Sequence, residues 1–109
     1  MEIKDCEKYC IITPLSPKLS EYEVARLGEE ISMHRTKKIG IDMSVVKDCT
    51  IDFVTELCKN HKIALFNLQS DIFALLLSMN MDKTIPLFVS EMDFIENKHQ
   101  LLNRKFCIV

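Results

Sequence analysis

Short apolar runs alternate with segments of helical spacing along almost the whole chain. The runs at 9–13, 38–43, 62–68 and 85–89 are rich in β-branched and aromatic residues, which favours strands. Two of them, 38–43 and 62–68, are mostly continuous apolar runs, as in strands buried on both faces of a parallel sheet. We therefore expect an α/β fold in one domain over residues 1–109, with a mixed central sheet, parallel inner strands and about four helices.

Helix signals separate the strands in the first half of the chain. Ser20 and Glu23 have the spacing of a capping box, which predicts a helix from Ser20 to about His34. A second helix is expected at 51–58, and a short first strand around Ile3.

The second half repeats the pattern. Ser70-Asp71 is expected to cap an apolar helix, and Ser90 with Asp93 to cap a last helix whose apolar spacing continues to residue 102. Pro86 predicts that 85–89 is an edge strand, or at least that this N–H position is unpaired. The run 105–109 is expected to be a closing strand or an apolar tail.

Glycine is scarce in this chain. The two glycines, Gly28 and Gly40, are twelve residues apart, whereas the phosphate-binding loops G-x-G-x-x-G and G-x-x-x-x-G-K need two within about six residues. Nucleotide binding through those loops is therefore excluded.

Charge and composition argue against two classes of partner. The chain has 14 basic and 16 acidic residues, a net charge of −2, no Trp, and lysines that are scattered along the sequence. A nucleic-acid-binding protein usually has a concentrated basic face, so we expect no nucleic-acid partner. No run approaches 18 apolar residues and the N-terminus lacks an apolar signal region, so no direct membrane insertion is expected.

The five cysteines are an odd number, and none of them forms C-x-x-C. A reduced, cytoplasmic protein is the expectation, with cysteines that are mostly buried as small apolar residues. A metal site from Cys6, Cys10 and a distant histidine has poor spacing for structural zinc. Cys49 has no histidine near it in sequence to act as a base.

Polar residues gather after the predicted strand 38–43, where α/β sheets usually place their functional edge. They form a rim that we expect to contact a partner, although a simple polar turn with Thr50 as helix cap and Asp52 as first-turn acid also explains them. The candidate partner-binding residues are Asp42, Ser44, Lys47, Asp48, Thr50, Asp52 and Phe53.

Three segments follow one another in the order of a known family. They are 41–46 (Ile-Asp-Met-Ser-Val-Val), 65–70 (Leu-Phe-Asn-Leu-Gln-Ser) and 90–95 (Ser-Glu-Met-Asp-Phe-Ile). In this order the chain resembles the STAS domain of sulphate transporters and anti-sigma factor antagonists. The resemblance implies a non-catalytic regulator of transcription whose partner is an anti-sigma-factor kinase, a stressosome-type assembly or a transporter component.

The functional loop of that family is altered here. Its Asp-Ser-Ser-Gly falls on Thr50-Ile51-Asp52-Phe53, so the serine that a partner kinase phosphorylates is replaced by Ile51. The resemblance therefore implies a member that is not switched at the usual position. Two substitutes are open: phosphorylation of Thr50, or a fixed negative charge from Asp52.

The sequence provides no convincing catalytic, cofactor-binding or metal-binding residues, so we expect that the protein is not an enzyme and has no cofactor. The alternative is a ligand-binding or enzymatic α/β domain with a site at the carboxyl-terminal strand ends, formed from Asp42, Asp48, Cys49 and His61.

Further association surfaces are also open. The apolar run 73–77, with Met79 and Met81, is either a helix covered on several sides or a docking patch. His99 is expected to be partly buried, and a homodimer through 105–109 is a third arrangement.

Overall fold

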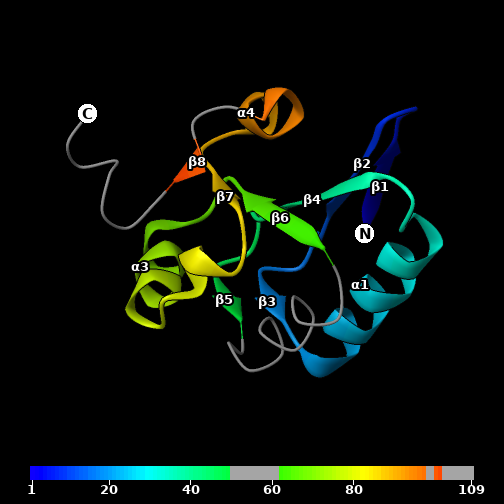
Figure 1. Ribbon diagram of the computed structural model, residues 1–109. Helices are drawn as coiled ribbons and strands as arrows, with labels where there is room; N and C mark the ends of the chain where they lie inside the picture. The colour runs from blue at the N-terminus through cyan, green and yellow to red at the C-terminus, as the bar shows by residue number, and fades with distance from the viewer. Residues whose placement is uncertain (50–61, 98–99, 102–109) are drawn as a thin grey trace.

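A six-stranded mixed sheet forms the centre of the molecule in a computed structural model that describes residues 1–49, 62–97 and 100–101 (Figure 1). The strand order is β1-β2-β4-β6-β7-β8. The four inner strands are parallel to one another, whereas β1 and β8 are antiparallel to their neighbours. This arrangement confirms the α/β class and the parallel interior. The strands are β1 (Glu2–Asp5), β2 (Tyr9–Thr13), β4 (Lys38–Asp42), β6 (Ile63–Phe66), β7 (Leu87–Phe88) and β8 (Gln100–Leu101).

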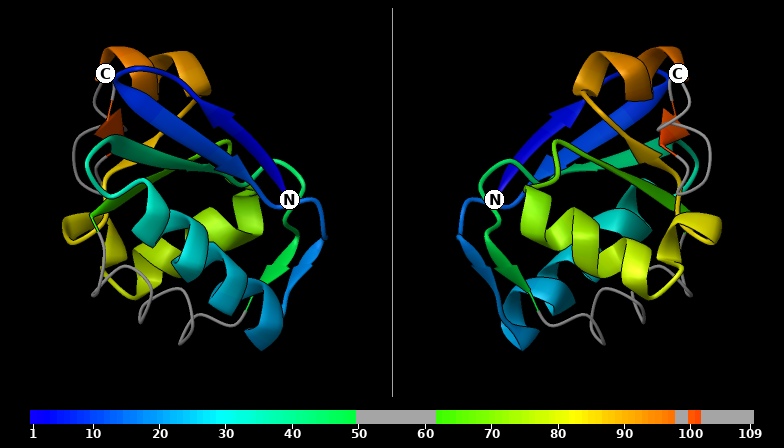
Figure 2. Two further views of the ribbon diagram at one scale, coloured as in Figure 1. Left: turned by 90° about the vertical axis from the view of Figure 1, so that its right-hand side faces the viewer. Right: turned by 90° about the vertical axis from the view of Figure 1, so that its left-hand side faces the viewer.

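Helices cover both faces of the sheet (Figure 2). α1 (Glu21–Met33) and α3 (Ser70–Ser78) lie on one face, and the short α4 (Glu91–Glu96) lies on the other. A 3-10 turn, η1 (Met81–Lys83), follows α3. The helix expected at 51–58 and the strand or tail expected at 105–109 lie outside the described residues.

Each face has its own hydrophobic core, because successive side chains of a strand point to opposite faces. The face under α1 and α3 holds the larger cluster, which includes alternate residues of β2 and β4. The opposite face holds a smaller, aromatic cluster around α4. The larger cluster includes Cys10, Ile12, Leu27, Ile31, Ile39, Ile41, Ile63, Leu65, Ile72 and Leu76, and the smaller one Ile11, Ala64, Phe66, Phe88 and Phe94.

Gly40 makes room for the aromatic cluster. A Cβ added to Gly40 would lie 2.7 Å from Cζ of Phe94, well inside van der Waals contact. Gly40 does not have a positive φ, so the position needs glycine for space and not for backbone freedom. The ring of Phe94 rests on the sheet at this point, stacked on Phe66 at 5.5 Å between centroids.

Asparagine occupies the left-handed positions in the described residues. Asn67, Asn80 and Asn97 have φ values of 56°, 57° and 56°. Asparagine tolerates this region better than other residues with a side chain. Asn97 follows the last residue of α4, so the helix ends there and does not continue to 102 as its apolar spacing predicts. The structure has β8 at that point instead.

The predicted caps have different outcomes. The Ser90 hydroxyl accepts a hydrogen bond from the Asp93 backbone N–H at 3.2 Å, which confirms that cap. Ser20 does precede α1, but its side chain makes no capping hydrogen bond. Ser70 is the first residue of α3 and not its cap, since Gln69 takes that position without a side-chain bond. The serines mark helix starts correctly, and a capping bond forms in one case of three.

Pro86 does not place 85–89 at the edge of the sheet. β7 begins after the proline, at Leu87, and pairs with β6 on one side and β8 on the other. The carbonyl of Pro86 still accepts a hydrogen bond from the Leu65 N–H at 3.0 Å. The edge strand predicted from Pro86 is therefore wrong, and the other prediction, that the backbone nitrogen at this position is unpaired, agrees with a strand that begins after the proline.

Candidate functional site

Asp42 ends β4 at the carboxyl edge of the parallel strands, as expected. One carboxylate oxygen, Oδ1, accepts from the backbone N–H of Ser44 at 3.0 Å and from Nδ2 of Asn67 at 3.2 Å. Gln69 Nε2 donates to the Ser44 carbonyl at 2.7 Å. The half-buried Asp42 carboxylate therefore ties the turn after β4 to the turn after β6, which is the structural role of a polar turn.

The segment after Asp42 is held by backbone bonds. The Met43 N–H donates to the Phe66 carbonyl at 2.9 Å. Lys47 and Asp48 both donate to the carbonyl of Pro17, at 2.8 and 3.0 Å. These two bonds lie directly before a second, two-stranded sheet, in which β5 (Asp48–Cys49) runs parallel to β3 (Lys18–Leu19). This sheet was not predicted from the sequence.

These bonds bring the loop after β2 beside the segment after β4. Leu15 lies in that loop with 54% of its surface exposed, although it is a large apolar residue. Ser44, Lys47 and Asp48 are also exposed, in the segment that these bonds join to that loop. We call Leu15, Ser44, Lys47 and Asp48 the carboxyl rim. It combines one apolar side chain, both signs of charge and a backbone fixed by hydrogen bonds.

The structure brings four of the predicted site residues to this edge. Asp42 supports the turn, while Ser44, Lys47 and Asp48 form its exposed surface. Leu15 was not among the predicted site residues. Its place between Pro14 and Pro17 is the sequence feature that could have indicated an exposed loop there. The remaining candidates, Thr50, Asp52, Phe53 and His61, and with them the Thr50 phosphorylation site, lie outside the described residues, as do Cys58, His99 and the side chain of Cys49.

A cavity of about 780 Å³ opens at the other, amino edge of the parallel strands. The alternative prediction placed a ligand site at the carboxyl ends, so this cavity is on the opposite side. Basic side chains surround it: Arg35, Lys37, Lys38 and Lys62. Its apolar wall includes Ile31, Ile39, Ile63, Ala64, Ile85, Pro86, Phe88 and Phe94.

Lys38 lies over the aromatic cluster at this cavity. Its ammonium group donates to the carbonyl of Phe94 and lies 4.6 Å from the centroid of the Phe94 ring and 5.8 Å from that of Phe88. Burial lowers the pKa of Lys38. Cation–π attraction and the carbonyl bond offset part of that desolvation.

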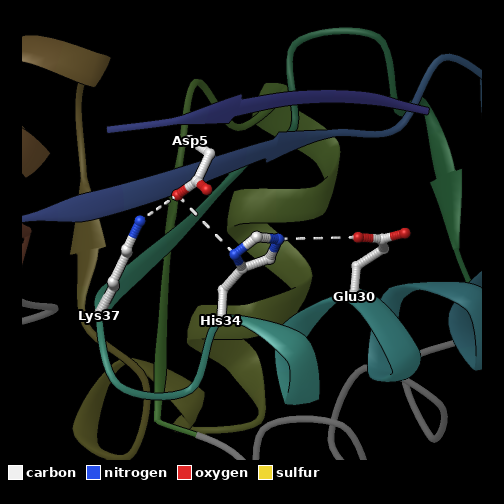
Figure 3. A network of polar contacts seen from close by, with 4 residues as sticks. All are labelled: Asp5, Glu30, His34 and Lys37. Carbon is white, nitrogen blue, oxygen red and sulfur yellow. Dashed lines mark hydrogen bonds and ion pairs between the residues drawn. The ribbon is translucent and has the colours of Figure 1, made fainter. Parts of the chain in front are cut away.

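A cluster of polar groups lies beside the cavity, where α1 returns to the sheet (Figure 3). His34 follows α1 and lies between two carboxylates: Nδ1 is 3.8 Å from Asp5 Oδ1, and Nε2 is 3.9 Å from Glu30 Oε2. Lys37 Nζ donates to Asp5 Oδ1 at 2.5 Å, and this bond holds the pKa of the Asp5 carboxyl below its usual value. Two acids, one base and one imidazole thus share one corner.

Cys10 belongs to the same corner. It lies opposite Asp5 in the β1–β2 pairing and is fully buried, and burial raises the pKa of its thiol. The burial of Cys10 confirms the prediction of a cysteine buried as a small apolar residue, and a buried thiol of raised pKa is a poor nucleophile. Strand register and the return of α1 bring Cys10, Asp5 and His34 together, and no short spacing in the sequence indicates this.

Comparison with models of known protein families and with curated proteins finds no match for this chain. The resemblance to STAS domains therefore depends on the residue pattern alone. Among the described residues, none of the helices combines the length and apolar character needed to cross a membrane.

Proposed function

We propose that this chain is a non-catalytic, STAS-like domain that regulates a protein partner by binding it through the carboxyl rim. The observation that carries the proposal is the combination of exposed Leu15 with Lys47 and Asp48 on a segment fixed by hydrogen bonds. A surface that is already ordered loses little conformational entropy on binding. The resemblance to STAS domains supports a protein partner of the kinase, stressosome or transporter type in the cytoplasm.

Two features argue for binding over chemistry at this edge. The carboxylate of Asp42 already accepts two hydrogen bonds that hold the local fold, so it is not a free general base. The usual phosphorylated serine is replaced by Ile51, which has no hydroxyl. The proposed mode of action is constitutive binding, without phosphorylation at that position.

Photo-crosslinking tests the proposed surface. A benzophenone amino acid replaces Leu15 in one protein and Arg35, at the opposite edge, in a matched control. We expect a specific protein adduct from the native host with the first protein and none of the same mass with the control. The double variant Lys47→Glu, Asp48→Lys should abolish that adduct, and Leu15→Ala should weaken binding of the identified partner about tenfold.

The opposite results would refute the proposal. An adduct of equal yield from both crosslinking positions, or partner binding that survives the charge reversal in a protein with an unchanged circular dichroism spectrum, places the contact elsewhere. Incubation with the cognate kinase and ATP, followed by intact mass, checks the switch separately. A gain of one phosphate that Thr50→Val removes would show that the chain is switched after all.

A second candidate function is favoured by the cavity at the amino edge. We propose that it binds a small anion with an apolar body, because Arg35, Lys38 and Lys62 surround an apolar wall of suitable size. The probe is 8-anilinonaphthalene-1-sulfonate, titrated calorimetrically. The double variant Arg35→Gln, Lys62→Gln should bind it about tenfold more weakly, and Lys18→Gln, which removes a lysine of β3, should bind it as the wild type does. Equal affinities in all three proteins would exclude this site.

A further inference from the structure

Three side chains of types that bind metal ions lie close together: Asp5 and His34, which Figure 3 draws, and Cys10. Asp5 ends β1, Cys10 lies opposite it in β2, and His34 follows the last residue of α1. One donor atom from each of the three lies within 4.8 Å of the other two. The residues come from three separate elements, so the fold itself creates the cluster.

The spacing is close to that of a coordinated ion. A tetrahedral zinc site with Zn–S of about 2.3 Å and Zn–N of about 2.1 Å separates its ligand atoms by about 3.3–3.8 Å. His34 Nδ1 and Asp5 Oδ1 are already 3.8 Å apart. Cys10 is fixed in the sheet, while the Asp5 side chain is 44% exposed and has room to turn. Shifts of about 1 Å in the side chains of Asp5 and His34 would therefore bring the three ligand atoms to the separations of a zinc site.

Glu30 provides an independent indication. Histidine ligands usually donate their second ring N–H to a carboxylate, which fixes the ring and increases its basicity. The Glu30 carboxylate lies 3.9 Å from His34 Nε2, on the side of the ring away from Asp5. Nδ1, the other ring nitrogen, faces Asp5 (Figure 3).

Lys37 occupies the place of a cation in the structure. Its ammonium group lies 2.5 Å from Asp5 Oδ1, so a metal ion must displace it or use the other carboxylate oxygen. A divalent ion would have its charge neutralised by two anionic ligands, the Cys10 thiolate and the Asp5 carboxylate, because an imidazole ligand adds no charge. Lys37 should thus act as a competitor of the ion.

We propose that Asp5, Cys10 and His34 form a binding site for a divalent transition-metal ion, Zn²⁺ above all. A thiolate, an imidazole and a carboxylate suit zinc or cobalt, whereas magnesium and calcium prefer oxygen ligands. On binding, a metal–sulfur bond replaces the S–H bond of Cys10 and the proton passes to water, with no change of oxidation state. The fourth position is open to water or to an outside ligand. The ion links the β1–β2 hairpin to the end of α1.

Cobalt titration of the reduced 109-residue chain tests the site. Co²⁺ should bind in a 1:1 ratio and produce a thiolate charge-transfer band in the near ultraviolet, and Zn²⁺ should displace it. Cys10→Ser should remove the band. His34→Asn and Glu30→Gln should each weaken Co²⁺ binding about tenfold or more. Lys37→Met should instead strengthen it severalfold, a result that a purely structural role for these residues does not predict.

Two control variants replace other ligand types in the chain. His61→Asn and Cys6→Ser should both retain the band and the affinity of the wild type. A charge-transfer band that survives Cys10→Ser, or is lost in Cys6→Ser, would assign the thiolate to another cysteine and overturn the proposal. If Cys10→Ser fails to fold, Co²⁺ affinities of His34→Asn and Lys37→Met that equal the wild-type value would overturn it as well.

Discussion

Gly40→Ala gives the sharpest test of the packing between the sheet and α4. The added Cβ would meet three ring carbons of Phe94, at 2.7, 2.8 and 2.9 Å. Ordinary carbon contacts begin at about 3.5 Å, so the ring must retreat by about 0.8 Å. The retreat is blocked on several sides, because Phe94 is fully buried against Phe66, Phe88 and Tyr9.

Overpacking of a close-packed core costs about 1–3 kcal/mol, and we expect about 2 kcal/mol here. An unfolding entropy of about 2.1 cal/mol/K per residue then predicts a Tm about 9 °C lower for a chain of 109 residues. Urea and thermal unfolding, followed by circular dichroism, measure both values. The matched control is Gly28→Ala inside α1, which should stabilise by about 0.5–1 kcal/mol because alanine favours a helix.

A double-mutant cycle shows whether the Phe94 ring is the cause. In a Phe94→Leu background, Gly40→Ala should cost less than about 1 kcal/mol, since the ring that obstructs the new methyl group is gone. An unchanged Tm for Gly40→Ala, or an equal cost with and without the Phe94 ring, would refute the reasoning.

Three further predictions concern turns, caps and charge. Asn80→Gly should be neutral or slightly stabilising, whereas Asn67→Gly should cost about 1 kcal/mol because it also loses the amide bond to the carboxylate of the β4 turn. Urea unfolding of the two variants measures the difference, and equal changes in the free energy of unfolding would contradict the prediction. Ser90→Ala should cost about 1 kcal/mol through loss of a capping bond, and Ser20→Ala clearly less; a reversed order in thermal unfolding would be contrary evidence. Lys37→Met should raise the pKa of Asp5 toward its usual value, as seen in a carboxyl-carbon NMR titration. The stability from this pair should be present above the usual Asp pKa and lost as the pH falls through the lowered one, so the Tm difference between wild type and Asp5→Asn should shrink in acid.

The inner strands could be predicted because burial on both faces leaves a strong signal. Runs of apolar residues at 9–13, 38–43 and 62–68 became β2, β4 and β6, with boundaries within two residues. The position of Asp42 at the carboxyl edge of the sheet could be predicted from the same topology, since the carboxyl ends of parallel strands lie at one edge. The class of the fold was therefore available from local pattern.

Features that depend on one residue's backbone or on strand register could not be predicted. Helical spacing of apolar residues continues past Asn97, but the left-handed conformation of that residue ends α4. The cluster of Asp5, Cys10 and His34 arises from an antiparallel register and the return of α1, neither of which appears as a motif. Spacing rules find sites only when neighbouring ligands are also close in sequence.

The outer strand β1 has a consequence for how molecules of this protein meet at high concentration. Its exposed residues Glu2, Lys4 and Asp5 are all charged, and two of them are held from opposite layers: Lys4 by Glu91 of α4, and Asp5 by Lys37 before β4. An unprotected sheet edge is a template for aggregation, and charged side chains are the usual means of blocking it. A second chain that added a strand here would have to place its own side chains beside these charged groups. This side of the sheet is thus protected against growth into fibres.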